Sequence, residues 1–297
     1  MGKEKVVNKE VVITTVDLGN MNIKYIGRER GMFSAKISND IQSYEEGFQR
    51  IELDGRITYI GIGELSREFS KAEREYKTQL LYAICKANSN QESIETNLTL
   101  LLPALQMPNK KKMVDDLKGK EFNFKFNGKD RKVLINDLAV LPEGYVSYFD
   151  LTEEEKKEDL CIIDCGSRTM NICCIIEGKI EKMNTVKLGS LDFFSKIKSI
   201  EAAKGKDYVE EDIERLIKRG NIKVSEGQYE SFFKEMLNSI KSYVNIDNYT
   251  TIFTGGTSVI VKKYIECSGY KIHGEPLYSN INGAVKASNI IWSNRNV

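Results

Sequence analysis

Histidine is almost absent from this 297-residue chain, since His273 is the only one. A single imidazole removes most catalysis that depends on histidine. Six cysteines are present, but no two of them form a Cys-x-x-Cys pair. We therefore expect buried free thiols in a reducing cytosol rather than a zinc site. Any chemistry should depend on carboxylates, a metal ion and backbone amides.

Long apolar runs and an excess of one charge are also missing. The longest apolar candidate, residues 98–105, is interrupted by Pro103 and falls short of the roughly 18 residues that span a membrane. Residues 1–10 are charged and lack the apolar core of a signal peptide. Lysine and arginine number 44 against 43 acidic residues, which argues against direct binding to nucleic acid. We expect a cytoplasmic protein with room for two domains and no membrane partner.

What the chain does contain is one turn that occurs twice. Residues 16–25 read Val-Asp-Leu-Gly-Asn-Met-Asn-Ile-Lys-Tyr, and residues 163–172 read Ile-Asp-Cys-Gly-Ser-Arg-Thr-Met-Asn-Ile. Each copy follows an apolar, β-branched run and precedes another strand-like stretch, and the copies lie about half the chain apart. This unit consists of a strand, an Asp-x-Gly hairpin and a return strand. Its repetition predicts a duplicated domain with a phosphate chain bound between the copies.

Periodicity along the chain indicates two α/β halves. We expect strands over residues 11–16, 22–27, 48–53, 57–62, 97–102, 122–126, 133–135 and 250–253, and a hairpin over 160–177. Residues 139–146 should form a strand that runs into a turn and then a helix. We expect helices over residues 71–88, 206–219 and 280–292, one that starts in the basic segment 109–120, and one opened by a capping box at Ser225 and Gln228. The charged stretch 151–159 should connect the halves. Long antiparallel hairpins match neither a Rossmann pattern nor a P-loop.

The two Asp-x-Gly turns have the residue types that phosphate binding requires. A glycine with small or polar neighbours lets a tight hairpin bring backbone N–H groups close to phosphate oxygens. The aspartate before it, Asp17 or Asp164, can hold a hydrated Mg²⁺ that contacts the phosphate. Lys24 adds a point charge toward the same phosphates.

A Gly-Gly pair follows a later strand. Residues 254–258 read Thr-Gly-Gly-Thr-Ser between a predicted strand and a predicted helix. Gly255 and Gly256 remove side chains where a base or ribose could approach, and the helix N-terminus lies nearby. The alternative is a simple strand-to-helix turn, but the two Asp-x-Gly turns favour a nucleotide.

Glu143 is the third element of the predicted site. It follows Pro142 at the end of a strand and precedes Gly144, so a turn should hold it at the mouth of the cleft. A carboxylate there could orient or deprotonate the water that attacks a terminal phosphate. The alternative is an acid favoured by the dipole of a following helix.

Taken together, these motifs resemble the actin-like ATPase superfamily. The resemblance covers roughly residues 11–290, with phosphate loops at 16–25 and 162–172, connecting segments at 139–148 and 280–290, and an adenosine motif at 251–258. Within the superfamily the chain looks most like the ParM-type plasmid-segregation actins of bacteria, through four shorter stretches: 17–24, 141–145, 203–208 and 282–284.

The resemblance implies a fold and a domain division. It implies an α/β fold of two similar actin-like (RNase H-like) domains, each a mixed sheet flanked by helices, with a nucleotide cleft between them. Domain I would take residues 1–152 and 276–297, with a small insertion subdomain at about 36–95, and domain II would take residues 153–275.

The resemblance also implies the site. Asp17 and Asp164 would position Mg²⁺ through water, with Asp164 also catalytic, and Glu143 would polarise the hydrolytic water. The nucleotide, ATP or GTP, would contact a set of residues from the three loops: Asp17, Gly19, Asn20, Asn22, Lys24, Gly166, Ser167, Arg168, Thr169, Gly255, Gly256 and Thr257. The family's second phosphate loop usually has glycine where Ser167 stands and often threonine where Arg168 stands, so Arg168 itself could touch nucleotide.

Two functions stay open at this stage. The resemblance to ParM-type proteins implies filaments that assemble with nucleotide and bind an adaptor protein, which holds plasmid DNA at its centromere. The alternative is a sugar or small-metabolite kinase of the same superfamily, although no dedicated substrate pocket can be identified. The modest length and the Pro142-Glu143-Gly144 turn favour the filament. A chaperone-like or rod-shape-type ATPase lacks support.

Overall fold

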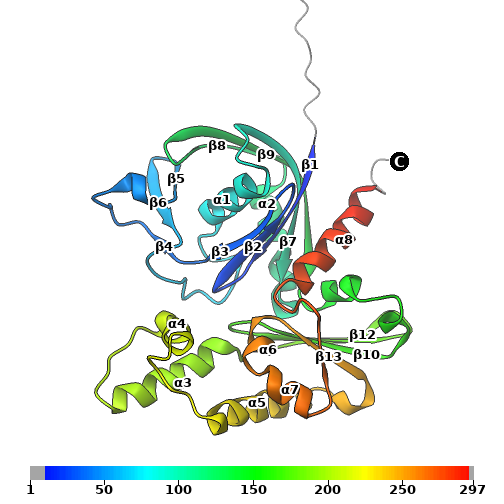
Figure 1. Cartoon of the computed structure of the whole chain (residues 1–297). Coiled ribbons are helices and arrows are strands. Elements are labelled where there is room, and N and C mark those ends of the chain that lie inside the picture. The colour runs from blue at the N-terminus through cyan, green and yellow to red at the C-terminus, as the bar shows by residue number, and fades with distance from the viewer. Residues whose placement is uncertain (1–10, 294–297) are drawn as a thin grey trace, which may run out of the picture.

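The computed structural model describes residues 11–293, which fold into two α/β halves, one above the other in Figure 1. The upper half contains a nine-stranded sheet. Its strands, from edge to edge, are β3 (Arg30–Ser34), β2 (Asn22–Ile26), β1 (Val12–Leu18), β7 (Ser93–Leu102), β9 (Lys129–Pro142), β8 (Lys120–Phe126), β5 (Arg50–Leu53), β6 (Arg56–Ile60) and β4 (Ile37–Ser38).

The lower half contains a five-stranded sheet. Its strands, in order, are β12 (Lys179–Val186), β11 (Met170–Ile176), β10 (Leu160–Cys165), β13 (Thr250–Thr254) and β14 (Lys271–Ile272). Both sheets contain the same motif: three consecutive antiparallel strands, β1–β2–β3 or β10–β11–β12, and a parallel neighbour, β7 or β13, on the other side of the first strand. The duplication predicted from the two turns is therefore present in the topology.

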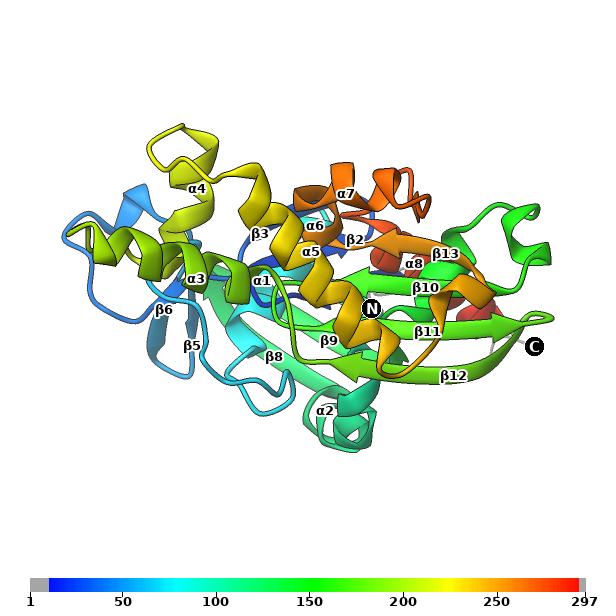
Figure 2. The same cartoon turned by 90° about the horizontal axis from the view of Figure 1, so that it is seen from below.

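Helices cover the sheets of both halves (Figures 1 and 2). In the upper half these are α1 (Lys77–Ala87), α2 (Lys110–Leu117) and α8 (Ser279–Ser293). In the lower half they are α3 (Ser190–Ala203), α4 (Ile213–Lys218), α5 (Glu226–Lys241), α6 (Gly256–Ile260) and α7 (Lys262–Cys267). Short 3-10 turns are η1 (Glu45–Gly47), η2 (Ala104–Asn109), η3 (Tyr145–Asp150), η4 (Glu155–Lys157), η5 (Glu210–Asp212) and η6 (Ile246–Asn248).

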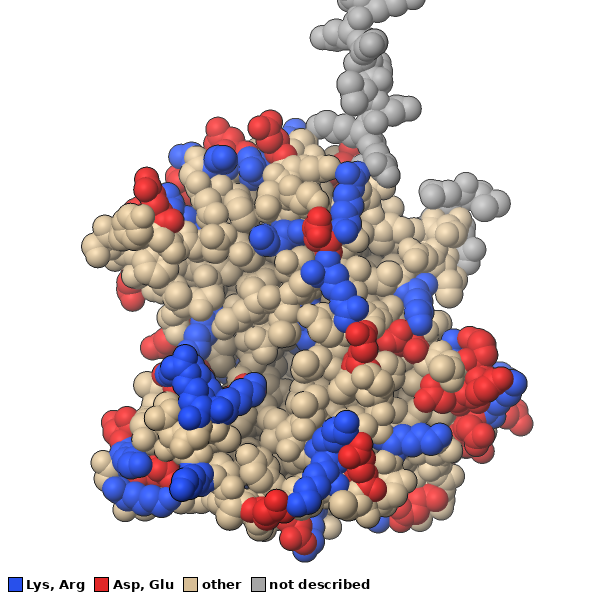
Figure 3. Space-filling view, in the orientation of Figure 1, with Lys and Arg blue, Asp and Glu red and all other residues tan. Residues whose placement is uncertain are grey.

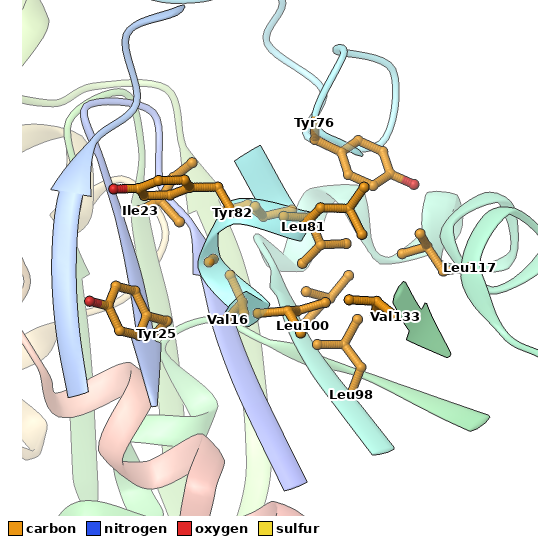
Figure 4. Close-up of a cluster of buried hydrophobic side chains, with 14 of the residues drawn as sticks. Val16, Ile23, Tyr25, Tyr76, Leu81, Tyr82, Leu98, Leu100, Leu117 and Val133 are labelled. Atoms are coloured by element: carbon orange, nitrogen blue, oxygen red, sulfur yellow. The ribbon is translucent and has the colours of Figure 1, made fainter. Parts of the chain in front are cut away.

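Each half buries its own apolar core. In the upper half, α1 packs Leu81 and Tyr82 against residues of the sheet that include Val16 and Leu100 (Figure 4). In the lower half, aromatic side chains from α3 and α5 meet, with the rings of Phe193 and Phe232 4.9 Å apart. Two separate cores give each half its own rigidity, so the loops between the sheets face each other from firm supports.

Local sequence chemistry explains most of these elements. The turns after β5, β8 and β11 use residues with positive φ, at Asp54–Gly55, Asn127–Gly128 and Glu177–Gly178, as tight hairpins require. Helix α5 begins with the predicted capping box, in which the Gln228 Oε1 accepts from the Ser225 backbone N–H at 2.7 Å.

Several predicted elements differ from those observed. The helix expected over 71–88 begins only at Lys77, because residues 71–74 turn into the space between the halves instead. The strand expected at 133–135 and the strand expected to start at residue 139 are one strand, β9, which ends at Pro142 before the expected turn. The helix expected over 206–219 is helical only from Glu210 and leaves Val209 exposed. Helix α3 was not predicted at all.

Three further findings bear on the sequence predictions. Five cysteines are buried free thiols as expected, but Cys267 on α7 is exposed. Within residues 11–293, no helix has both the length and the apolar character needed to span a membrane. The domain boundaries remain a prediction, and their parts at residues 1–10 and 294–297, like the expected absence of a signal peptide at residues 1–10, lie outside the described residues.

Candidate functional site

A cavity of about 380 Å³ lies between the two halves. On the face drawn in Figure 3 the molecule is hollowed between its upper and lower parts, and lysine and arginine side chains gather at the lower rim, over α4. The cavity is lined by every predicted site residue except Arg168: Asp17, Gly19, Asn20, Asn22, Lys24, Glu143, Asp164, Gly166, Ser167, Thr169, Gly255, Gly256 and Thr257. Four segments far apart in the sequence therefore meet in one place, although the roles of their residues remain predictions.

The first turn connects β1 to β2 and places Asp17 opposite Lys24 in the strand register. The Lys24 Nζ lies 3.3 Å from the Asp17 Oδ2. The turn is tight at Gly19, because a Cβ there would lie 2.1 Å from the backbone oxygen of Asn22. Only glycine fits that approach, which leaves the backbone of the turn open toward the cavity.

Sequence reasoning missed two basic residues behind this turn. Lys71 is buried, with its Nζ 3.1 Å from the Asp17 Oδ1 and in contact with the Glu143 Oε1. Arg74 is also buried and donates to the Asn20 Oδ1 at 3.1 Å and to the backbone oxygen of Leu18. Both come from residues 71–74, where the sequence predicts an amphipathic helix, and nothing in the local pattern indicates that these two cations are buried.

Glu143 projects from the turn that follows β9. Its backbone N–H donates to the oxygen of Leu102 at 2.8 Å, and Gly144 beyond it has a φ of 78°. Asn280 of α8 fixes the turn from the other side, since its Oδ1 accepts from the Gly144 N–H at 3.0 Å and from the Ser147 hydroxyl at 2.8 Å. The backbone that carries this carboxylate is therefore held in place by β7 and α8.

The second turn connects β10 to β11 and places Asp164 opposite Asn171. The Asn171 Nδ2 donates to the Asp164 Oδ2 at 3.2 Å and to the Glu143 Oε2 at 2.9 Å. Its Oδ1 accepts from the Thr185 hydroxyl at 2.9 Å. One buried amide thus joins the carboxylates of both halves, and only its place in the repeated turn could have indicated Asn171 in advance.

The three carboxylates have different ionisation preferences. Burial alone would raise the pKa of Asp17, but the charges of Lys71 and then Lys24 outweigh burial and lower its pKa to about 2. Burial raises the pKa of Glu143, against the opposing charge of Lys71. Burial also raises the pKa of Asp164, whose partners Asn280 and Asn171 are neutral amides. Asp17 is therefore held as an anion more firmly than the other two.

The Gly-Gly loop supports the second turn. Gly255 has a φ of 85°, and a Cβ there would lie 2.4 Å from the oxygen of Cys165 and 2.7 Å from the Asp164 Oδ1. The Thr257 hydroxyl donates to the oxygen of Gly166 at 2.6 Å. A glycine is required here because the loop passes directly against Asp164.

The rest of the lining is more apolar. It is contributed by the first turn, β3, α3, the loop before α8, and α4 to α6: Met21, Met32, Ser190, Phe193, Phe194, Glu214, Ile217, Lys218, Tyr229, Val259, Ile260 and Leu277. Aromatic and aliphatic walls with a few polar groups are typical of pockets for flat organic ligands. The spacing of Leu191, Phe193, Phe194 and Ile197 in α3 could have signalled this wall.

Arg168 does not line the cavity. Its guanidinium instead donates to the backbone oxygen of Glu68 at 3.1 Å and to that of Ser66. The residue therefore ties the second turn to a segment of the upper half. The sequence suggested a direct contact with nucleotide, and its position outside the lining does not favour that contact.

The donor set of the cavity is suited to a Mg²⁺ ion that a phosphate chain helps to hold. Within residues 11–293, no group of three or more His, Cys, Asp or Glu side chains could hold a metal ion alone. Magnesium ions in nucleotide sites usually take one or two carboxylates and complete their shell with phosphate and water. Asp17 and Asp164, both buried and facing the cavity, match that requirement.

The fold, with its cleft between two duplicated halves, is that of the actin-like proteins. Residues 15–145 match the sequence family described as actin like proteins N terminal domain. Among curated proteins, none matches the chain in sequence.

Solved structures extend the similarity in fold beyond residues 15–145. A 15-stranded ParM filament from Clostridium botulinum is 16% identical, with a TM-score of 0.79 over 95% of this chain and 99% of that one. The archaeal actin homologue Ta0583 in complex with ADP is 18% identical, with a TM-score of 0.77 over 94% and 100%. The AlfA filament from B. subtilis plasmid pLS32 is 21% identical, with a TM-score of 0.64 over 93% and 98%. The predicted similarity to the actin-like superfamily, with ParM-type relatives, is confirmed.

Proposed function

We propose that this protein is a nucleoside triphosphatase whose filaments segregate plasmid DNA. The observation that supports this most directly is the meeting of two Asp-x-Gly turns and Glu143 around one cavity between duplicated halves. The solved relatives include a ParM filament and an AlfA filament, and one relative was solved with ADP. Under this proposal the partners are further copies of the chain and an adaptor protein bound at the plasmid centromere, in a bacterial cytoplasm.

In the proposed mechanism, different residues of the cleft bind the phosphates, hold the metal ion and activate water. The backbone amides of residues 19–22 and 166–169 would hold the phosphates of ATP or GTP, with Lys24 adding charge. Asp17 and Asp164 would hold Mg²⁺ through water, and the ion would neutralise phosphate charge. Glu143 would orient the attacking water and accept its proton, a role that suits a carboxylate whose pKa is raised by burial.

Assembly is the first test of this function. Light scattering should rise when Mg-ATP or Mg-GTP is added to the purified protein, and electron microscopy should then show filaments. A lack of assembly with both nucleotides over a wide range of protein concentration would contradict the filament proposal. Transfer of phosphate to a small hydroxyl compound without assembly would favour the kinase alternative.

Hydrolysis is the second test. Glu143→Ala should lower phosphate release by a factor of about 10² or more, since general-base contributions are of that size, while filaments persist longer. Glu158→Ala, which changes an exposed glutamate on the connection between the halves, is the matched control and should keep wild-type turnover. Unchanged turnover in Glu143→Ala would remove Glu143 from the catalytic role.

A further inference from the structure

Lys71 places a buried positive charge among the acidic residues of the cleft. Its side chain is 4% exposed, and its Nζ reaches both Asp17, at 3.1 Å, and Glu143. A buried ammonium needs such partners, because an unpaired one would cost several kcal/mol of desolvation. The two carboxylates in turn obtain a counter-charge within the protein itself.

The segment that carries Lys71 is held in place from its own half. The backbone N–H of Lys71 donates to the Gln106 Oε1 at 2.8 Å, and the Gln106 Nε2 donates to the oxygen of Phe69 at 3.0 Å. This pair of bonds fixes the backbone on both sides of Ser70. The ammonium therefore sits at a defined position rather than at the end of a free loop.

The opposite half holds the same segment. Arg168 donates to the backbone oxygens of Ser66 and Glu68, and the Lys187 Nζ lies 4.5 Å from the centre of the Phe69 ring. Arg168 belongs to the second phosphate loop and Lys187 follows β12, so both contacts cross the cleft. The position of Lys71 thus depends on how the two halves sit against each other.

A divalent cation and this ammonium would compete for the same oxygens. Two like charges a few ångströms apart repel strongly in a buried site, and Asp17 already contacts both Lys71 and Lys24. A bound phosphate chain would change the balance, because it adds several negative charges that could pair with the ammonium and the metal at once.

We propose that Lys71 is a positioning residue that serves as the resident counter-cation of Asp17 and Glu143, held there by Arg168. The empty cleft then rejects free divalent cations and accepts one only together with a phosphate chain. This inference rests on the proposed nucleotide function, but its first test requires no nucleotide.

Binding of Mn²⁺ to the nucleotide-free protein, followed by electron paramagnetic resonance, tests the role of Lys71. Lys71→Met keeps the length of the side chain and removes its charge, so Mn²⁺ should bind at least about tenfold more tightly than to the wild type. Lys71→Arg keeps a charge and should retain the weak binding of the wild type. Lys112→Met removes a lysine that pairs with Glu73 of the same segment at the surface, and it should change nothing.

The same titration tests the contact across the cleft. Arg168→Gln should give an Mn²⁺ affinity between those of the wild type and Lys71→Met, because the ammonium is then less firmly held. Arg67→Gln changes an exposed arginine of the same segment and is the control. A wild-type affinity in Arg168→Gln would overturn the role of Arg168, and a wild-type affinity in a folded Lys71→Met would overturn the whole inference.

Nucleotide binding separates this inference from the proposed function. Fluorescent mant-ATP and mant-GTP, added with Mg²⁺ to the wild type, report whether the cleft binds nucleotide. Failure of both to bind contradicts the proposed function, whatever the Mn²⁺ titration gives. Binding to the wild type together with no gain of Mn²⁺ affinity in Lys71→Met contradicts only the inference about Lys71. Circular dichroism of each variant verifies that it is folded.

Discussion

The two Asp-x-Gly turns share a backbone plan and differ in charge. Each aspartate stands at the end of a central strand, and the residue opposite it in the hairpin register is Lys24 in the first turn and Asn171 in the second. Lys71 and Arg74 add positive charge behind the first turn. The second carboxylate is bonded by the Asn171 amide instead.

This difference gives the two equivalent aspartates opposite shifts in pKa. Cations lower the pKa of Asp17 to about 2, whereas burial among neutral partners raises the pKa of Asp164. Asp17 is therefore held as an anion near neutral pH by the positive charges of Lys71 and Lys24. The ionised form of Asp164 would be stabilised more than that of Asp17 by a bound cation. The two halves share the strand and the turn of the backbone, whereas a few side chains determine the electrostatics of each turn.

The largest difference between the two turns is expected when the charge of each aspartate is removed. Asp17→Asn should lower the free energy of unfolding by about 3 kcal/mol, because it leaves the buried Lys71 without one of its two carboxylates. Asp164→Asn should not lower it, because its partners are amides that can bond a neutral group. Urea unfolding at pH 7 measures both, and equal losses would contradict the contrast.

The two turns also differ in the space around their glycines. A Cβ at Gly19 would lie 2.1 Å from a backbone oxygen, whereas one at Gly166 would lie 3.1 Å from its nearest neighbour. Gly19→Ala should therefore destabilise the protein by about 2 kcal/mol and Gly166→Ala by less than about 1 kcal/mol. Gly227→Ala, in α5 with no atom near the added methyl, should stabilise the helix by about 0.5 kcal/mol. Thermal unfolding of the three variants gives the order.

The pH dependence of stability should differ in sign between the two aspartates. The raised pKa of Asp164 contributes stability below its ordinary pKa near 4, and this contribution is lost as pH rises. Relative to the wild type, Asp164→Asn should therefore gain free energy of unfolding as pH rises above about 4, by at most ~1.4 kcal/mol per pH unit. The lowered pKa of Asp17 contributes stability above about pH 4 that is lost as pH falls toward 2. Urea unfolding of the metal-free protein at several pH values measures these dependences. If the wild type and Asp164→Asn show the same dependence of stability on pH, the prediction is wrong.

The smallest expected effect comes from making the first turn resemble the second. Lys24→Asn should lower the free energy of unfolding by less than about 1 kcal/mol, because the pair is partly exposed and Lys71 remains. Lys125→Asn is a matched control, since Lys125 lies at the same 3.3 Å from Glu52 in a more exposed pair. Its loss should be smaller still. A larger loss in the control than in Lys24→Asn would mean that Lys24 adds nothing to the first turn.

The sequence predicted those parts of the site that reside in short contiguous motifs. Asp17, Glu143, Asp164 and Gly255 were found because each stands at a strand end beside a turn residue. Lys71 and Arg74 were missed because their partners lie 54 or more residues away. Nothing local distinguishes a buried cation from one on the solvated face of a helix.

The fold was predictable to a similar extent. The repeated strand–turn–strand pattern identified the duplication and the α/β class, since strand periodicity is a local property. The nine-strand order of the upper sheet was not predictable, because β8 and β5 pair through residues far apart in the chain. Arg168 illustrates the same limit, since its bonds to two backbone oxygens of the other half could not be predicted from its position in the loop.

The distribution of the thiols has a practical consequence. Five of the six cysteines are buried inside the two halves, and only Cys267, on α7 of the lower half, is open to reagents. A maleimide dye should therefore attach at one known point of the native protein, without any engineered cysteine. Every labelled copy would then carry its reporter at the same place, so that single molecules can be counted and followed.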